Sequence, residues 1–277
     1  MKEGFVEEAT LSQAYHAALL TLQKYGEEAD CADWEQKQKE LSMTIIIDEP
    51  LQEPMISKYF IGGPEALEQY RQEMLDGILD FEVEKGNWAY TYHDRMVNYP
   101  MTWKTTYSLD THTIITDNSI NQIDFVINEL KRNPSSRRAV VLVRDPSVDT
   151  NSDDPACLQH IQYFIRNNKL HCKVLFRSND ACKASFMNMF ALIMLQKRIA
   201  DELGIELGTY VHRANSYHCY EKDYEMLKNY TDAITEAVNL GEKNQIALAF
   251  NYKDGWDELM EEFKPDIEKK VKELKER

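Results

Sequence analysis

Residues 154–188 read DPACLQHIQYFIRNNKLHCKVLFRSNDACKASFMN and gather a thiol, a guanidinium, a carboxylate and an amide in one short segment. Cys157 follows Pro155 at a position where the backbone is biased towards extended or turn geometry. An apolar run at 161–165 comes next, so the pattern predicts a thiol at the entrance of a β-strand. A second strand, predicted at 170–176, ends directly before an arginine and a serine.

The end of this second strand suits a ligand that carries a phosphate and a flat ring. Arg177 offers charged paired donors to a phosphate, and Ser178 adds a neutral donor. Asp180 supplies an acceptor, while the amide of Asn188 both donates and accepts. Groups of this kind read a planar heterocycle through hydrogen bonds.

Composition limits the class of protein. The chain has 277 residues, of which 43% are hydrophobic, and we expect one domain spanning 1–277. A net charge of -15 argues against broad binding of nucleic acid or of a membrane surface, because both need a basic face. The five cysteines are odd in number and lack a CxxC pair, so neither a disulfide framework nor a zinc site is predicted. The beginning of the chain resembles neither a signal peptide nor a membrane span, and we expect a cytoplasmic protein.

Hydrophobic periodicity predicts a mixture of helices and strands. The predicted helices cover 10–25, 64–77, 121–130, 189–203 and a charged tail within 253–277. The predicted strands, besides those already named, cover 43–48, 88–96, 139–143, 208–214 and 246–250. In the 64–77 helix, Leu67, Tyr70 and Met74 form an apolar stripe that is typical of packing.

Two further pairs of residues are candidates for ligand binding. Arg137 and Arg138 stand at the mouth of the 139–143 strand, where adjacent like charges are costly unless an anion binds; the alternative is a solvated pair. His218 and Tyr220 lie two apart on an extended chain, so they point the same way and can hold a sugar hydroxyl. A histidine satisfied within the core is the alternative there.

Four motifs in one order within 80–225 resemble the thymidylate synthase family, including its pyrimidine-nucleotide hydroxymethylases. They are the phosphate element NPSSRRAVV (133–141), the nucleophile segment DPACLQ (154–159), RSND (177–180) with Asn188, and the sugar-binding SYHCY (216–220). The short form YTYHDR (90–95) is most similar to compact archaeal- or phage-type members.

The resemblance implies an α/β (α+β) protein with a three-layer fold, in which helices pack on a large mixed β-sheet. It also implies a sheet-to-sheet homodimer, with Arg137 and Arg138 reaching the phosphate bound by the partner subunit. The implied ligands are a pyrimidine nucleoside monophosphate and 5,10-methylenetetrahydrofolate, with Asp180 contacting the pterin.

The implied chemistry begins with Cys157, whose thiolate adds to C6 of the pyrimidine and makes C5 a nucleophile. Nearby arginines would favour the thiolate, whereas an isolated buried cysteine is inert. A glutamate of the 64–77 helix acts with water in proton transfer in this family; Glu68 is favoured over Glu65 and Glu73.

Asn188 carries the base preference, because an amide can accept from the ring N3–H while donating to O4, which is the pattern of uracil. We therefore expect a uridylate as substrate, with Asn188 serving both binding and catalysis. The resemblance implies that the sugar is deoxyribose, as in dUMP. The alternatives are a (d)CMP 5-hydroxymethylase and a nucleotide-binding regulatory homologue without turnover.

Two departures from the family bear on the outcome. The stretch before the 43–48 strand holds no arginine, and the chain ends in a Glu- and Lys-rich helix where family synthases have a short apolar closing segment. Because exclusion of water decides between a methyl and a hydroxymethyl group, thymidylate and 5-hydroxymethyl-dUMP are both expected products.

Overall fold

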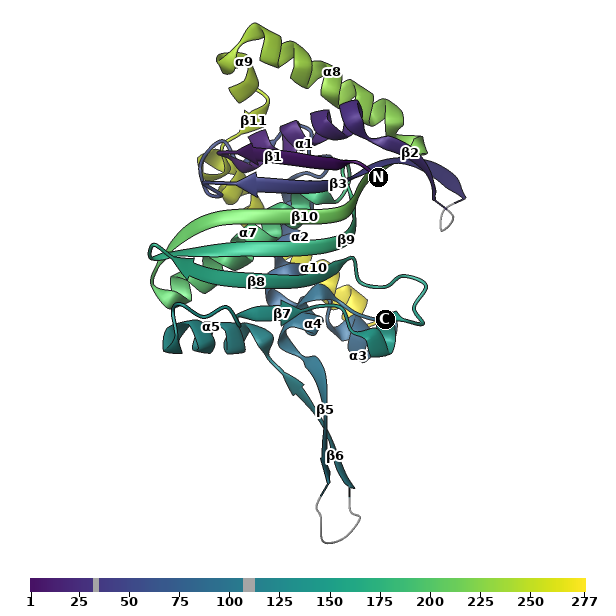
Figure 1. Ribbon diagram of the computed structural model, residues 1–277, viewed down its shortest axis with the longest axis vertical. Coiled ribbons are helices and arrows are strands. Elements are labelled where there is room, and N and C mark those ends of the chain that lie inside the picture. The colour runs from purple at the N-terminus through teal and green to yellow at the C-terminus, as the bar shows by residue number, and fades with distance from the viewer. Residues whose placement is uncertain (32–34, 107–112) are drawn as a thin grey trace.

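A seven-stranded mixed sheet forms the centre of the computed structural model, which describes residues 1–31, 35–106 and 113–277 and the side chains outside 102–117. The strands run in the order β1, β3, β10, β9, β8, β7, with β2 paired to β3 (Figure 1). Their bounds are β1 Glu3–Glu8, β2 Glu27–Cys31, β3 Gln36–Ile47, β7 Val140–Leu142, β8 Leu158–Arg166, β9 Lys169–Asp180 and β10 Glu206–Tyr220. The pairs β9–β10 and β1–β3 are parallel, and the other neighbours are antiparallel.

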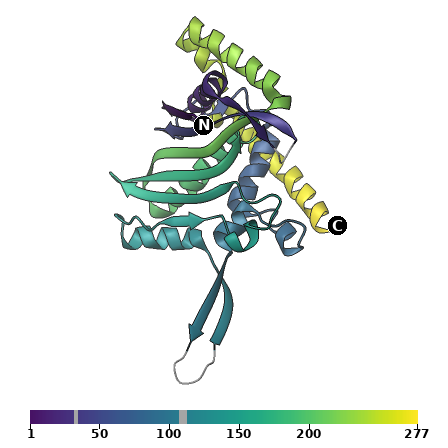
Figure 2. The same cartoon turned by 45° about the vertical axis from the view of Figure 1, so that its right-hand side comes forward.

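Helices cover one face of this sheet. The inner helices are α1 (Leu11–Tyr25), α5 (Gln122–Arg132) and α7 (Ser185–Leu203). The helices packed outside them are α2 (Pro64–Asp76), α8 (Tyr224–Leu240) and α10 (Asp257–Lys275). Figure 2 shows these layers in an oblique view. The opposite face of the sheet carries exposed apolar side chains, including Phe5, which is 64% exposed, and Leu142, which is 47% exposed.

Shorter elements connect these layers. The helical ones are α3 (Phe81–Glu84), α4 (Tyr92–Val97), α6 (Pro146–Asp149), α9 (Glu242–Ile246), η2 (Glu221–Asp223) and η3 (Tyr252–Trp256). Two small sheets join β4 (Ile56–Ser57) to β11 (Ala249–Phe250) and β5 (Tyr99–Thr106) to β6 (Thr113–Ile120). The β5–β6 ribbon extends away from the rest of the molecule (Figure 1). None of the helices in the described part of the chain has the length and apolar character needed to cross a bilayer.

Local signals explain most of the predicted helix boundaries. Thr10 caps α1 through a capping box with Gln13, which satisfies backbone N–H groups at the start of the helix. Pro64 begins α2, and glycines in the left-handed conformation follow α2 and α7. The predictions of a helix at 10–25, at 64–77 and at 121–130 are confirmed, as are the two strands that follow Cys157.

Two predictions from the sequence are wrong. The expected strand at 88–96 contains the start of α4, because the Thr91 side chain accepts a hydrogen bond from the backbone of Asp94 and caps a helix. The expected strand at 246–250 is shorter, since Ile246 ends α9 and β11 begins only at Ala249. The pairing of β5 with β6 was not predicted at all.

We expect Gly77→Ala to destabilise the fold more than Gly204→Ala. Both glycines have a positive φ, of 63° and 68°, so alanine is strained at either position by about 1 kcal/mol. A methyl group on Gly77 would also collide with His93 and Asp80, which bind each other at 2.6 Å, whereas one on Gly204 meets open space. Urea unfolding should therefore show a loss of about 3 kcal/mol for Gly77→Ala and about 1 kcal/mol for Gly204→Ala. Equal losses would contradict the clash.

Candidate active site

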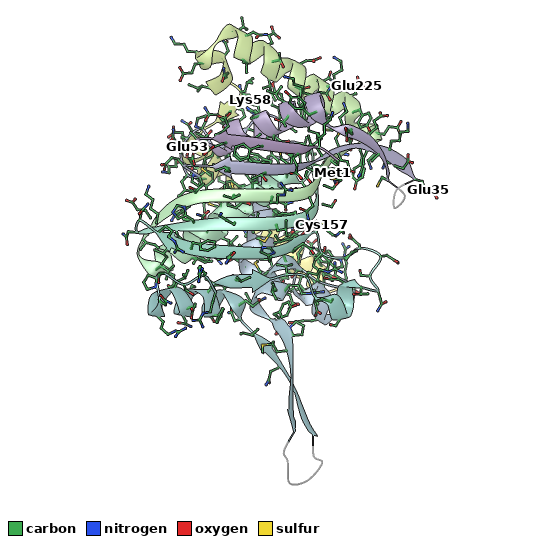
Figure 3. All side chains as sticks on the ribbon, in the orientation of Figure 1. Met1, Glu35, Glu53, Lys58, Cys157 and Glu225 are labelled. Atoms are coloured by element: carbon green, nitrogen blue, oxygen red, sulfur yellow. The ribbon has the colours of Figure 1, made fainter. Side chains whose placement is uncertain are left out.

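Cys157 lies immediately before β8, at the end of the sheet where that strand begins (Figure 3). Arg177, three residues before the end of β9, fixes the backbone that leads to Cys157: Nη2 donates to the Pro155 carbonyl at 2.7 Å and Nε to the Ala156 carbonyl at 3.3 Å. The backbone N–H of Arg177 also donates to the Cys157 carbonyl at 2.8 Å. Because three bonds from one residue hold this turn, the position of the sulfur is set by the sheet.

The electrostatic balance at Cys157 favours the thiol. Partial burial raises the pKa of Cys157, the charge of Arg177 lowers it, and the charge of Asp154 raises it again. The net result is a raised pKa. The charge of Arg177 acts in the expected direction, because it favours the thiolate. Within one chain, however, the desolvation of Cys157 has a larger effect on its pKa than this charge.

Strand β10 brings a second set of groups beside β9. Ser216 lies opposite Ser178 and His218 opposite Asp180, in parallel register. His218 is buried, which lowers its pKa and keeps the ring neutral, and its Nδ1 lies 3.4 Å from Ser178 Oγ. Its Nε2 is buried without a hydrogen-bond partner among the described residues. Because a buried polar atom without a partner is costly, this nitrogen is suited to a ligand hydroxyl.

Tyr220 and Asp180, the other residues predicted for this region, contact neighbouring groups of the same end of the sheet. The rings of His218 and Tyr220 lie with their centroids 4.7 Å apart, as expected for neighbours two apart on a strand. Asp180 Oδ1 accepts from the backbone N–H groups of Cys182 at 2.9 Å and Lys183 at 3.0 Å, which shapes the turn that leads into α7.

Asn188 lies in the first turns of α7, buried, and its Oδ1 accepts a hydrogen bond from the Tyr70 hydroxyl of α2. Sequence reasoning did not identify Tyr70 as a site residue. Tyr70 belongs to the apolar stripe of α2, and a tyrosine in such a stripe gives no signal that distinguishes packing from a role in a site.

Glu68, the glutamate favoured from the sequence, binds groups of its own helix and no other residue predicted for the site, among those that the structure describes. Its carboxylate is buried and accepts from Arg71 at 2.6 and 2.7 Å and from Gln72 at 2.7 Å. Residues two apart on a helix face different sides, so the helix that turns Tyr70 towards Asn188 turns Glu68 away. Glu73, three residues from Tyr70, shares its side, and burial raises the pKa of Glu73.

A cavity of about 430 Å³ opens beside these residues. Its wall includes the aromatic side chains of Tyr70, Trp88, Tyr90 and Tyr92 and the acidic residues Glu73 and Asp154. Flat walls and carboxylates together fit a flat ring that carries N–H donors, so the residues present fit a pterin. A larger cavity of about 860 Å³ lies among α2, α5 and α7, and its lining includes no residue predicted for the site.

The aromatic wall is held in place from behind. The Arg95 guanidinium lies over the Tyr90 ring at 5.6 Å from its centroid and donates to Asp149 at 3.1 Å. The Tyr92 hydroxyl accepts from the backbone of Leu158 at 3.4 Å, so the wall is tied to the strand that follows Cys157.

Arg137 and Arg138 lie elsewhere within one chain. They are exposed in the loop before β7, where the Arg137 carbonyl accepts from Gln162 at 2.9 Å. Gln162 is five residues from Cys157 along the extended chain, or about 16 Å. A single chain therefore does not bring these arginines to Arg177.

Comparisons with known proteins give a consistent result. The family model described as thymidylate synthase matches residues 59–264. A protein of Methanocaldococcus jannaschii named "Putative thymidylate synthase" is 34% identical over 232 residues, which cover 81% of this chain and 95% of that protein. One of Methanosarcina barkeri with the same name is 29% identical over 236 residues, covering 84% and 95%.

A solved structure shares the fold. Thermostable thymidylate synthase A from Bacillus subtilis aligns with a TM-score of 0.59 and 19% identity, over 81% of this chain and 84% of that one. The large mixed sheet with packed helices is therefore the one expected from the sequence.

The reactivity of Cys157 should follow its raised pKa. Because the thiolate is the reactive form, alkylation by iodoacetamide should rise about tenfold per pH unit and should not level off below pH 9, the ordinary cysteine value. Mass spectrometry of the Cys157 peptide measures this rate. Arg177→Gln should slow it at every pH, since the substitution removes the charge that lowers the pKa. A plateau of the alkylation rate below pH 9 would contradict the raised pKa of Cys157.

Proposed function

Because the chain belongs to the thymidylate synthase family, we propose that it transfers a one-carbon unit to C5 of dUMP. One observation carries the proposal: a partly buried thiol, a guanidinium, an amide and an unpartnered histidine nitrogen lie at one end of the sheet, beside an aromatic cavity. The product is thymidylate or 5-hydroxymethyl-dUMP.

Cys157 is the proposed nucleophile. Its thiolate adds to C6 of the uracil ring, which places a carbanion at C5 that can attack an electrophilic carbon. Arg177 uses Nε and Nη2 to hold the turn, and its Nη1, which has no hydrogen-bond partner among the described residues, is the proposed donor to the phosphate of dUMP. Ser178 adds a neutral donor beside it.

The base of dUMP is assigned to Asn188 of α7, and its sugar to residues of β10. The Asn188 amide pairs with N3–H and O4 of uracil, and it stabilises the charge that develops at O4 when C6 is attacked. The buried Nε2 of His218 binds the 3'-hydroxyl together with Tyr220, which gives the histidine the partner that it otherwise lacks.

The cavity is assigned to the one-carbon donor. When bound there, 5,10-methylenetetrahydrofolate supplies the one-carbon unit and, for a methyl product, a hydride. Trp88 and Tyr90 provide flat walls for the pterin, and Asp180 is a further proposed contact. How well these walls exclude water decides between the two products.

The proposal includes a homodimer. The exposed apolar residues Phe5 and Leu142 belong to the sheet face that helices do not cover, which suits burial against a second copy. Arg137 and Arg138 are then available to the phosphate site of the partner subunit, which explains why one chain leaves them exposed and distant from Arg177.

Release of tritium from [5-³H]dUMP in the presence of methylenetetrahydrofolate tests the chemistry. We expect release with the intact protein and none with Cys157→Ala, because C5 exchanges its hydrogen only after attack at C6. The mass of the product distinguishes a methyl from a hydroxymethyl group. Release from dCMP alone would reassign the substrate, and tight binding of dUMP without release would support a regulatory homologue.

Mixing inactive variants tests the shared site. Cys157→Ala and the double variant Arg137→Ala with Arg138→Ala should each be inactive, yet exchanging their subunits should restore about a quarter of the activity. The reason is that half of the dimers are mixed and each mixed dimer has one intact site. As control, Cys157→Ala mixed with Asn188→Ala should restore nothing, because both residues serve the same subunit's site. Absence of recovery in the first mixture would place both arginines outside the site.

A further inference from the structure

We propose that Tyr70 sets the base preference by fixing the orientation of the Asn188 amide, an inference that rests on the proposed function. Tyr70 lies in the middle of α2, and its hydroxyl meets Oδ1 of Asn188 near the start of α7. None of the motifs that identify the family contains Tyr70. The contact is nevertheless partly buried and directed at Asn188, the one side chain proposed to read the base, which is itself buried.

The direction of this hydrogen bond follows from burial. Burial raises the pKa of Tyr70, so the phenol keeps its hydrogen and has to donate it. Asn188 Oδ1 is the acceptor of that hydrogen among the described residues. A flipped amide would turn its NH2 group towards the phenol and leave the hydroxyl hydrogen without this acceptor. The amide oxygen therefore faces Tyr70, and Nδ2 points to the other side.

This orientation has a consequence for the base. Nδ2 donates to no residue that the structure describes, so it is available to a ligand carbonyl. Uracil presents a carbonyl at C4, whereas cytosine presents an amino group that would meet Nδ2 donor to donor. A carbonyl oxygen has two lone pairs, so Oδ1 can accept from Tyr70 and from the uracil N3–H together. The fixed amide thus matches uracil and opposes cytosine.

The two helices that carry the pair are themselves tied together. Arg198 of α7 donates to the Leu75 carbonyl at 2.6 Å and to Asp76 at 2.7 Å, both at the end of α2. On the far side of α2, Glu68 is bound by Arg71 and Gln72. These bonds between Glu68, Arg71 and Gln72 stabilise the helix that carries Tyr70.

Tyr70→Phe removes the hydroxyl and keeps the ring. We expect the ratio of kcat/KM for dUMP to that for dCMP, measured by tritium release from C5, to fall at least about tenfold, because the amide is then free to flip. Tyr163→Phe is the matched control, since it removes the hydroxyl of a different tyrosine, which is buried in β8, away from the site. It should leave the ratio within about twofold.

The variant Asn188→Asp distinguishes a role of Tyr70 in orienting the amide from a merely structural role. Asn188→Asp replaces the amide by a carboxylate whose two oxygens are equivalent, so there is no orientation to fix. In that background Tyr70→Phe should change the base ratio by less than about twofold, and the two substitutions should be strongly non-additive. The inference would be overturned if Tyr70→Phe changed the dUMP-to-dCMP ratio equally with Asn188 and with Asp at position 188. It would also be overturned if Tyr70→Phe left this ratio unchanged in the protein that keeps Asn188.

Binding distinguishes failure of the inference from failure of the proposed function. Calorimetric titration with dUMP and with dCMP gives the same base ratio without turnover. If no tritium is released by the intact protein, the proposed chemistry fails, but the loss of dUMP preference in Tyr70→Phe is still measured. If release occurs while Tyr70→Phe keeps the original ratio in both kinetics and binding, the chemistry stands and the role of Tyr70 is overturned.

Discussion

The guanidinium of Arg177 holds the carbonyls of Pro155 and Ala156, and the arrangement of the site depends on this contact. It joins the end of β9 to the turn before β8, so the sulfur of Cys157 is positioned by the sheet and not by a free loop. The same arginine is also the positive charge that offsets part of the desolvation of the thiol. Placement of the Cys157 sulfur and the acidity of its thiol are therefore coupled through one side chain.

Much of the fold could be predicted because its signals are local. A capping threonine, an N-terminal proline and terminal glycines mark α1, α2 and α7, and apolar runs mark β8 and β9. The error at 88–96 arose where alternating aromatics resembled a strand, although Thr91 caps a helix. The β5–β6 ribbon is rich in threonine and lacks the regular apolar alternation by which a half-buried strand is recognised.

The candidate site, like the fold, could be predicted only in part. The residues that the sequence grouped within 154–188 and 216–220 meet at one end of the sheet, because adjacent strands carry them in register. The sequence did not reveal which side of α2 faces the site, since helix phase relative to a distant partner depends on tertiary packing. That phase turns Tyr70 towards Asn188 and turns Glu68 towards Arg71 of its own helix. The two exposed arginines illustrate a second limit, because their proposed role depends on a second copy of the chain.

The strand order has a consequence for biosynthesis. Strand β10 lies between β3 and β9, yet it is translated after both of them. Until residues 206–220 leave the ribosome, the two halves of the sheet have no common strand, and the edges of β3 and β9 that will receive β10 stay unpaired. The two halves of the sheet can therefore join only after β10 has been synthesised, late in the growth of the chain.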